Sequence, residues 1–127
     1  MWKGWTWIMA GAFFTGLVFG ANPEYPRAYE LYQHTDYKQA IAILEKVLNP
    51  EPATLLLLGR AYFGAGDYAR ATDTLEKGVQ RAPKDSEMYA WLGRAWGMRA
   101  DTSAIWNQPR YASRSREIGR ASCRERV

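Results

Sequence analysis

Few side chains in this sequence could carry out chemistry. His34 is the only histidine and Cys123 the only cysteine among the 127 residues. A catalytic or metal site needs a nucleophile with a base, a carboxylate pair or several metal ligands, and neither residue has such a companion in the sequence. His34 comes just before a Thr-Asp turn, where a position at a helix end accounts for it. We therefore expect no catalytic residue, no metal site and no cofactor, and predict that the protein is not an enzyme.

The aspartates and glycines of the chain have structural explanations. Asp36, Asp67 and Asp85 each occupy a position where a carboxylate can cap the free amides at the start of a helix. The glycine-containing stretch GRAYFGAG, residues 59–66, lacks the lysine of a phosphate-binding loop and follows no strand. A helical pattern explains these residues without a bound phosphate.

The elements that would position any site are paired helices. Leu55, Leu58, Gly59 and Tyr62 have the spacing i, i+3, i+4, i+7, which places them on one face of a helix. A glycine inside a helix costs about 1 kcal/mol relative to alanine, so Gly59 indicates that a second helix approaches closely at this point.

A second helix follows after a tight turn. Gly66 can adopt the left-handed conformation that ends a helix, and Asp67 can cap the next one. Ala71 and Leu75 share one face of this second helix, which Pro83 ends. The sequence thus predicts two antiparallel helices.

The same pattern occurs on either side. Upstream, TDYKQAIAILEKVLNPEP from Thr35 parallels GDYARATDTLEKGVQRAP from Gly66, and Asp36 with Gln39 predicts a capping box. Downstream, YAWLGRAW at 89–96 repeats LLLLGRAY at 55–62 with an offset of 34 residues. This offset is the period of one class of helical repeat.

On these residues the chain resembles a tetratricopeptide repeat protein over about residues 24–100. The resemblance implies an all-α fold of helical hairpins, stacked as a short right-handed solenoid of about two and a half repeats. Two features depart from the pattern: Gly78 stands where alanine is favoured, and the first repeat is three residues short. The structural positions of the repeat would be Leu55, Leu58, Gly59, Tyr62, Ala71, Leu75, Pro83, Tyr89, Leu92, Gly93 and Trp96.

By the same resemblance, the first helix of each hairpin would line a concave groove that binds a protein or peptide. Aromatic and arginine side chains are frequent at binding hot spots, and arginine pairs well with carboxylates, so a partner segment that carries carboxylates fits. The tyrosines could instead pack between helices, and the sequence does not decide between this role and one in the groove. The groove positions would be Tyr25, Tyr29, Tyr32, Leu56, Arg60, Phe63, Ala90, Arg94 and Met98.

The first 20 residues predict export to the periplasm or cell envelope. Lys3 precedes an apolar run from about Trp5 to Phe19, and small residues follow, which is the order of a secretory signal. Cleavage after Gly20 is our preferred interpretation. The alternative is an inner-membrane anchor through residues 5–20, although this run falls just short of the about 20 apolar residues that span a bilayer.

The end of the chain differs in character from the rest. Asp101, Thr102 and Ser103 predict a loop, and Pro109 suits the first turn of a helix that begins near Arg110. Beyond Arg116 the apolar period fails, because only Ile118, Cys123 and Val127 are apolar, at spacings of five and four. The helix that should complete the third repeat is therefore not recognisable.

Residues 117–127, EIGRASCRERV, resemble the translation of a widely used short-read sequencing adapter. We predict that they are not native and that the gene continues past Arg116. The formal net charge of +4 then falls to +3, because the segment holds three arginines and two glutamates. Binding to nucleic acid, which a basic arginine-rich tail would favour, loses its main support.

The sequence therefore predicts a signal or anchor at 1–20, a repeat domain at 21–116 and a non-native tail at 117–127. The function predicted is that of a non-catalytic interaction scaffold with a protein or peptide partner. Two alternatives stay open: a docking module of an enzyme or transport component whose working domain lies beyond Arg116, and a membrane-anchored assembly factor. Because fewer than three complete repeats leave an apolar helix face uncovered, we also expect marginal stability or self-association.

Overall fold

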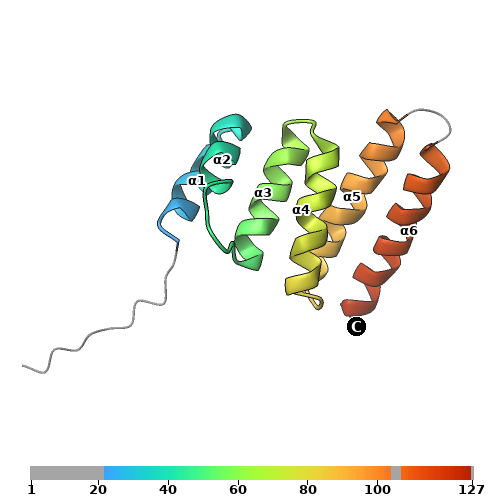
Figure 1. Cartoon of the computed structure of the whole chain (residues 1–127). Coiled ribbons are helices and arrows are strands. Elements are labelled where there is room, and N and C mark those ends of the chain that lie inside the picture. Colours follow the sequence, from blue (N-terminus) through green and yellow to red (C-terminus); the bar gives the residue numbers. More distant parts are fainter. Residues whose placement is uncertain (1–21, 104–106, 127) are drawn as a thin grey trace, which may run out of the picture.

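The computed structural model describes residues 22–103 and 107–126, and their regular structure is helical throughout. The all-α prediction is confirmed. The proposed signal at 1–20 lies outside the described residues. None of the helices in the described ranges combines the length and apolar character that crossing a membrane requires. The helices are α1 (Glu24–Gln33), α2 (Tyr37–Leu44), α3 (Pro52–Gly64), α4 (Tyr68–Arg81), α5 (Ser86–Thr102) and α6 (Gln108–Glu125) (Figure 1).

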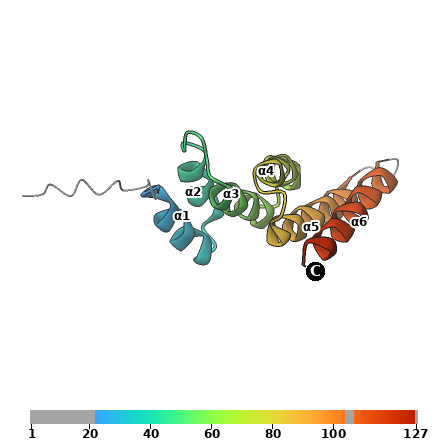
Figure 2. The ribbon, with the colours of Figure 1, turned by 90° about the horizontal axis from the view of Figure 1, so that it is seen from below.

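The helices pack in chain order as three hairpins, α1 with α2, α3 with α4 and α5 with α6 (Figure 1). In addition, α3 contacts both α1 and α5, so the first helices of the hairpins are neighbours. Figure 2, a view at right angles, shows α2 and α4 to one side of α1, α3 and α5. The surface formed by α1, α3 and α5 is called here the first-helix face.

Aspartates begin three of the helices, as predicted. Asp36, Asp67 and Asp85 accept hydrogen bonds from backbone amides two or three residues further along α2, α4 and α5. The capping box at α2 has a different form from the one expected. The side-chain amide of Gln39 donates to the Asp36 carboxylate, whereas the Asp36 backbone amide donates to the carbonyl of Leu31.

The turns that join α1 to α2 and α3 to α4 each contain a left-handed residue. Gly66 has φ +80° at the turn from α3 to α4, which confirms its predicted role. The residue at the equivalent turn from α1 to α2 is Thr35, which has φ 61°. A β-branched residue rarely adopts this conformation, so the first turn is strained relative to the second.

The core lies within and between the hairpins, where the predicted structural positions meet. A Cβ on Gly59 would lie 2.5 Å from Leu75 Cγ, so the close approach of α4 to α3 requires glycine here. Of the predicted positions, Tyr89, Gly93 and Trp96 are half-buried, and Pro83 is exposed just after the end of α4. The buried ones are Leu55, Leu58, Gly59, Tyr62, Ala71, Leu75 and Leu92.

The two departures from the repeat pattern have local explanations. A Cβ on Gly78 would lie 2.5 Å from Met88 Sδ, so this glycine makes room for a fully buried methionine. The three residues missing from the first repeat shorten its second helix, because α2 has 8 residues and α4 has 14. The chain leaves α2 through a loop in which Leu48 is 89% exposed and Asn49 has φ 53°.

One expectation for the end of the chain was wrong and another was confirmed. Asp101 and Thr102 belong to α5 and only Ser103 lies beyond it, because the buried Ala100 keeps the last turn of α5 packed. Helix α6 begins at Gln108, near Arg110 as expected, with Pro109 in its first turn.

The apolar period fails after Arg116 as expected, but α6 nevertheless continues to Glu125. Small and hydroxyl-bearing residues extend the inward face of α6, because Ser115 Oγ donates to the Gly93 carbonyl at 2.7 Å and Ser122 Oγ to the Ser86 carbonyl at 3.0 Å. Ile118 is buried on this face and Cys123 is exposed. A search for apolar residues alone could not detect such a face.

Candidate partner-binding surface

The first-helix face carries a group of aromatic and arginine side chains, called here the Arg60 cluster. Helix α1 contributes one tyrosine, and α3 and α5 each contribute an arginine and an aromatic residue. Each of these side chains contacts at least one other member of the cluster. The members are Tyr32, Arg60, Phe63, Trp91 and Arg94.

Arg60 is the central cation of this cluster. Its guanidinium carbon lies 4.9 Å from the ring centre of Tyr32 and 5.0 Å from that of Trp91, within the range of cation–π attraction. Its Nε donates to Tyr32 Oη at 3.3 Å, and its Nη1 lies 3.5 Å from Glu87 Oε1. With only 23% of its side chain exposed, Arg60 ties α1, α3 and α5 together.

Trp91 joins the two arginines of the cluster. The guanidinium carbon of Arg94 lies 4.8 Å from its ring centre, and the ring of Phe63 meets it edge-on at 5.6 Å. The sequence analysis did not select Trp91, because the repeat pattern places it beside the groove positions rather than among them. The preference of binding hot spots for tryptophan was the signal that could have identified it.

Arg94 is the exposed cation of the cluster. Its guanidinium group stacks on Trp91, and within residues 22–103 and 107–126 no carboxylate lies within ion-pair distance of it. An arginine that is held by an aromatic ring and lacks a carboxylate partner can receive one from another molecule.

The other predicted groove residues lie outside the Arg60 cluster. Tyr25 and Tyr29 stack on each other along α1, with ring centres 6.3 Å apart. Leu56 is half-buried and packs against the core, and Ala90 and Met98 are half-buried on α5. The structure thus brings together four of the predicted residues, Tyr32, Arg60, Phe63 and Arg94.

For the tyrosines, the two interpretations left open by the sequence apply to different residues. Tyr32 packs between helices, because it contacts Arg60 of α3 and lies 5.6 Å from the ring of Tyr37 in α2. Tyr29, by contrast, is 39% exposed and belongs to the surface.

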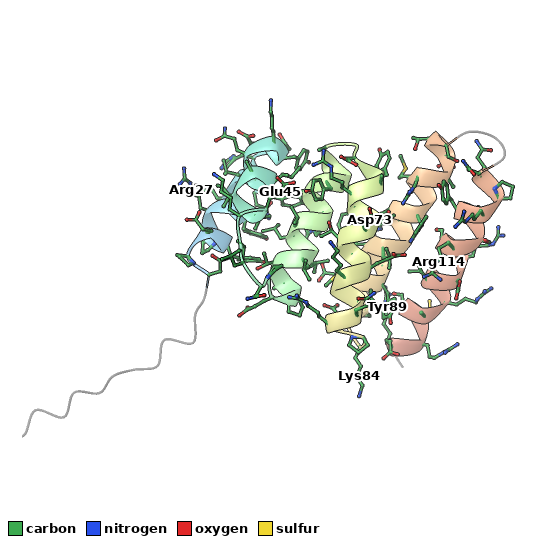
Figure 3. The ribbon with its side chains drawn as sticks, in the orientation of Figure 1. Arg27, Glu45, Asp73, Lys84, Tyr89 and Arg114 are labelled. Carbon is green, nitrogen blue, oxygen red and sulfur yellow. The ribbon has the colours of Figure 1, made fainter. Side chains whose placement is uncertain are left out.

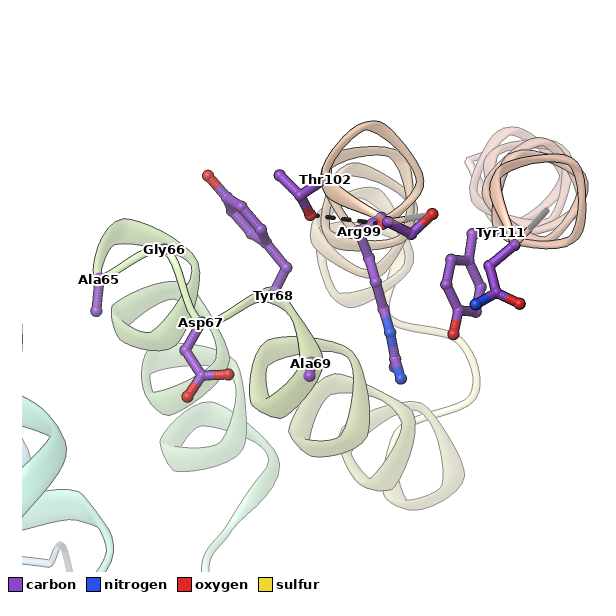
Figure 4. Close-up of a pocket in the computed structure, with 10 residues that line it drawn as sticks. Ala65, Gly66, Asp67, Tyr68, Ala69, Arg99, Thr102 and Tyr111 are labelled. Atoms are coloured by element: carbon purple, nitrogen blue, oxygen red, sulfur yellow. Dashed lines mark hydrogen bonds between the residues drawn. The ribbon is translucent and has the colours of Figure 1, made fainter. Parts of the chain in front are cut away.

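A second arginine, Arg99, joins α4, α5 and α6. Its guanidinium carbon lies 4.9 Å from the ring centre of Trp96 and 5.0 Å from that of Tyr111. Its Nη1 donates to Thr72 Oγ1 at 2.8 Å and lies 3.9 Å from Asp73 Oδ1. Arg99 borders an open pocket of about 560 Å³ between the start of α4 and the end of α5 (Figure 4), but these contacts already satisfy its charge.

A third group links the residue just after α2 to α3 and α4. The hydroxyl of Tyr62 donates to Glu45 Oε1, and Arg70 Nη1 lies 3.4 Å from the same oxygen. Burial raises the pKa of Tyr62 above its ordinary value, and the hydrogen bond to Glu45 raises it further. This group holds the first hairpin against the second.

Other charged side chains point into solvent. Arg27 projects outward from α1 and Lys84 from the turn between α4 and α5 (Figure 3). Within the described part of the chain, no three His, Cys, Asp or Glu side chains lie close enough together to hold a metal ion.

Comparison with known protein families gives one match. The family model described as "Tetratricopeptide repeat" matches residues 31–95, from the last turn of α1 to the middle of α5. The match includes all five members of the Arg60 cluster. No curated protein and no solved structure matches the chain significantly.

Proposed function

Because this chain belongs to the tetratricopeptide repeat family, we propose that it is a non-catalytic scaffold that binds a partner protein on its first-helix face. Repeats of this family suggest protein–protein interaction. The observation that carries the proposal is the position of Arg94, an exposed guanidinium group on the ring of Trp91 with no carboxylate partner among the described residues.

The chemistry of the Arg60 cluster selects the kind of partner. Aromatic rings offer apolar area at little entropic cost, and two guanidinium groups on one tryptophan attract negative charge. A protein segment with aspartate or glutamate beside an apolar residue satisfies both, and we propose such a segment as the ligand.

We place this scaffold in the cell envelope. The support is the order of Lys3, the apolar run from about Trp5 to Phe19 and the small residues after it, which is that of an export signal. N-terminal sequencing of exported material tests the location, since a start at Ala21 indicates a cleaved signal and a start at Met1 a retained anchor.

The binding proposal is tested with Arg94→Glu, which reverses the charge of the exposed arginine. Wild type and variant are immobilised, and partners are recovered from envelope extract and quantified by mass spectrometry. Arg27→Glu is the matched control, because Arg27 is exposed and points away from the other helices (Figure 3). Arg60→Glu is a weaker test on its own, because Arg60 also holds three helices together.

The expected result is a protein that is lost with Arg94→Glu and retained with Arg27→Glu. Its dissociation constant for the wild type should rise with salt, as for an interaction between opposite charges. Equal recovery by Arg94→Glu and the wild type would remove the first-helix face as the binding surface.

A further inference from the structure

We propose that the Glu87 carboxylate pairs with Arg60 at the position where a partner carboxylate would bind. An acidic segment then binds Arg60 by displacing Glu87. This inference rests on the proposed function and specifies how the same surface selects its ligand. Glu87 Oε1 lies 3.5 Å from Arg60 Nη1, and both residues belong to the first-helix face.

The two partners of this ion pair are held very differently. Arg60 is fixed by the rings of Tyr32 and Trp91 and by the hydrogen bond to Tyr32 Oη, and 23% of its side chain is exposed. Glu87 has 58% of its side chain exposed. An ion pair with one well-solvated partner is weak, so the carboxylate can leave while the guanidinium group stays in place.

Displacement of the Glu87 side chain leaves the start of α5 intact. The helix is capped by Asp85, whose Oδ1 accepts from the backbone amides of Glu87 and Met88 at 2.9 and 3.1 Å. A free Glu87 carboxylate also remains in the first turn of a helix, where negative charge is favourable. The exchange therefore has no cost to the backbone.

The arrangement gives the two arginines different tasks. Arg94 has no carboxylate among the described residues and can accept the first acidic side chain of a partner directly. A second acidic side chain reaches Arg60 only in competition with Glu87. Glu87 therefore reduces the affinity that a second carboxylate adds, because that carboxylate gains only the difference between its own contact with Arg60 and the one it displaces.

The test uses a fluorescein-labelled hexaglutamate peptide as the probe and a hexaglutamine peptide as its uncharged counterpart. Fluorescence anisotropy gives the dissociation constants for the wild type, Glu87→Gln and Glu87→Ala. Asp101→Asn is the matched control, because Asp101 is an exposed carboxylate at the other end of the same helix. Circular dichroism establishes that each variant is folded.

Both Glu87 variants are expected to bind hexaglutamate about twofold to fivefold more tightly than the wild type, as the loss of a weak competing ion pair implies. The affinity of Asp101→Asn for hexaglutamate should increase less than that of either Glu87 variant. The affinity for hexaglutamine should be the same in all variants. Affinities for hexaglutamate that are equal in the wild type and the Glu87 variants would overturn the competition.

The same measurements separate failure of this inference from failure of the proposed function. If Arg94→Glu weakens hexaglutamate binding while Glu87→Gln has no effect, the binding surface stands and Glu87 is not a competitor. If hexaglutamate binds neither the wild type nor Glu87→Gln, or binds Arg94→Glu as well as the wild type, the acidic ligand is wrong and both proposals fall.

Discussion

Gly59 lies so close to Leu75 that a Cβ atom on the glycine would stand 2.5 Å from Leu75 Cγ. At Gly93, the equivalent position of the next repeat, a Cβ would meet no atom closer than 3.7 Å. The same residue type in the same repeat position is thus required in one hairpin and dispensable in the other. The cause is the distance of the opposing helix: Leu75 of α4 reaches Gly59, whereas Ile118 Cγ2 and the Ser115 carbonyl of α6 stay 3.7 Å from a Cβ on Gly93.

We predict opposite effects of alanine at these two glycines. Gly59→Ala gains about 1 kcal/mol of helix propensity but forces Leu75 to move, which typically costs about 1–3 kcal/mol, so a net loss of about 1 kcal/mol is expected. Gly93→Ala should raise the free energy of unfolding by up to about 1 kcal/mol. Urea denaturation measures both, and equal shifts would contradict this account of the packing.

The strained turn at Thr35 predicts a stabilising substitution. Thr35 has φ 61°, whereas Gly66 occupies the equivalent turn with φ +80°. Thr35→Gly removes left-handed strain of about 1–2 kcal/mol, but glycine also makes the unfolded chain more flexible, which offsets part of this stabilisation. The free energy of unfolding should therefore rise by about 0.5–1 kcal/mol. Gly66→Thr should have the opposite sign. A lower melting temperature for Thr35→Gly would show that the turn is not strained.

The raised pKa of Tyr62 predicts a dependence of stability on alkaline pH. A neutral phenol is favoured in the folded state, so its contribution is complete below the ordinary pKa of 10.0 and is lost as pH rises towards the higher folded value. Tyr62→Phe should cost about 1 kcal/mol at neutral pH, through the lost hydrogen bond to Glu45. Between pH 9 and about pH 11, the free energy of unfolding measured with urea should fall less for this variant than for the wild type. If the unfolding free energies of the wild type and Tyr62→Phe fall equally with pH, groups other than Tyr62 cause the loss of stability at alkaline pH.

Trp91 should matter for both stability and binding. Trp91→Leu removes the ring on which Arg60 and Arg94 stack and the edge contact with Phe63. The expected loss is about 1–3 kcal/mol of unfolding free energy, below the cost at a fully buried site, together with weaker binding of hexaglutamate. Trp91→Phe keeps an aromatic face and should retain most of both. If Trp91→Leu binds the peptide as the wild type does, the tryptophan only fills space.

The origin of residues 117–127 remains a prediction and has a direct test. Part of this segment forms the last turns of α6, but a helical conformation does not identify the gene that encodes it. A long sequencing read of the source DNA across the codon for Arg116 is expected to diverge from EIGRASCRERV immediately after that codon. A genomic reading frame that encodes this segment would restore a basic tail and make an anionic surface the leading candidate partner.

Much of the fold could be predicted because the repeat acts through local rules. The caps at Asp36, Asp67 and Asp85, the left-handed Gly66 and the buried Leu75 follow from residue type and spacing alone. The course of α6 could not, because its inward face consists largely of small and hydroxyl-bearing residues such as Ser115 and Ser122. Such a face is recognised only when the helix opposite it is known.

The sequence by itself determined the all-α class and the turn and cap of the central hairpin, because helical periodicity and capping depend on near neighbours in the chain. Four members of the Arg60 cluster came only from the resemblance to the repeat family. Only the tertiary structure decided which arginine is held and which is exposed. Arg60 and Arg94 occupy equivalent positions of consecutive repeats, yet one meets Tyr32, Trp91 and Glu87 while the other meets Trp91 alone. The physical reason is that these contacts join three separate helices, and only their packing brings the side chains together.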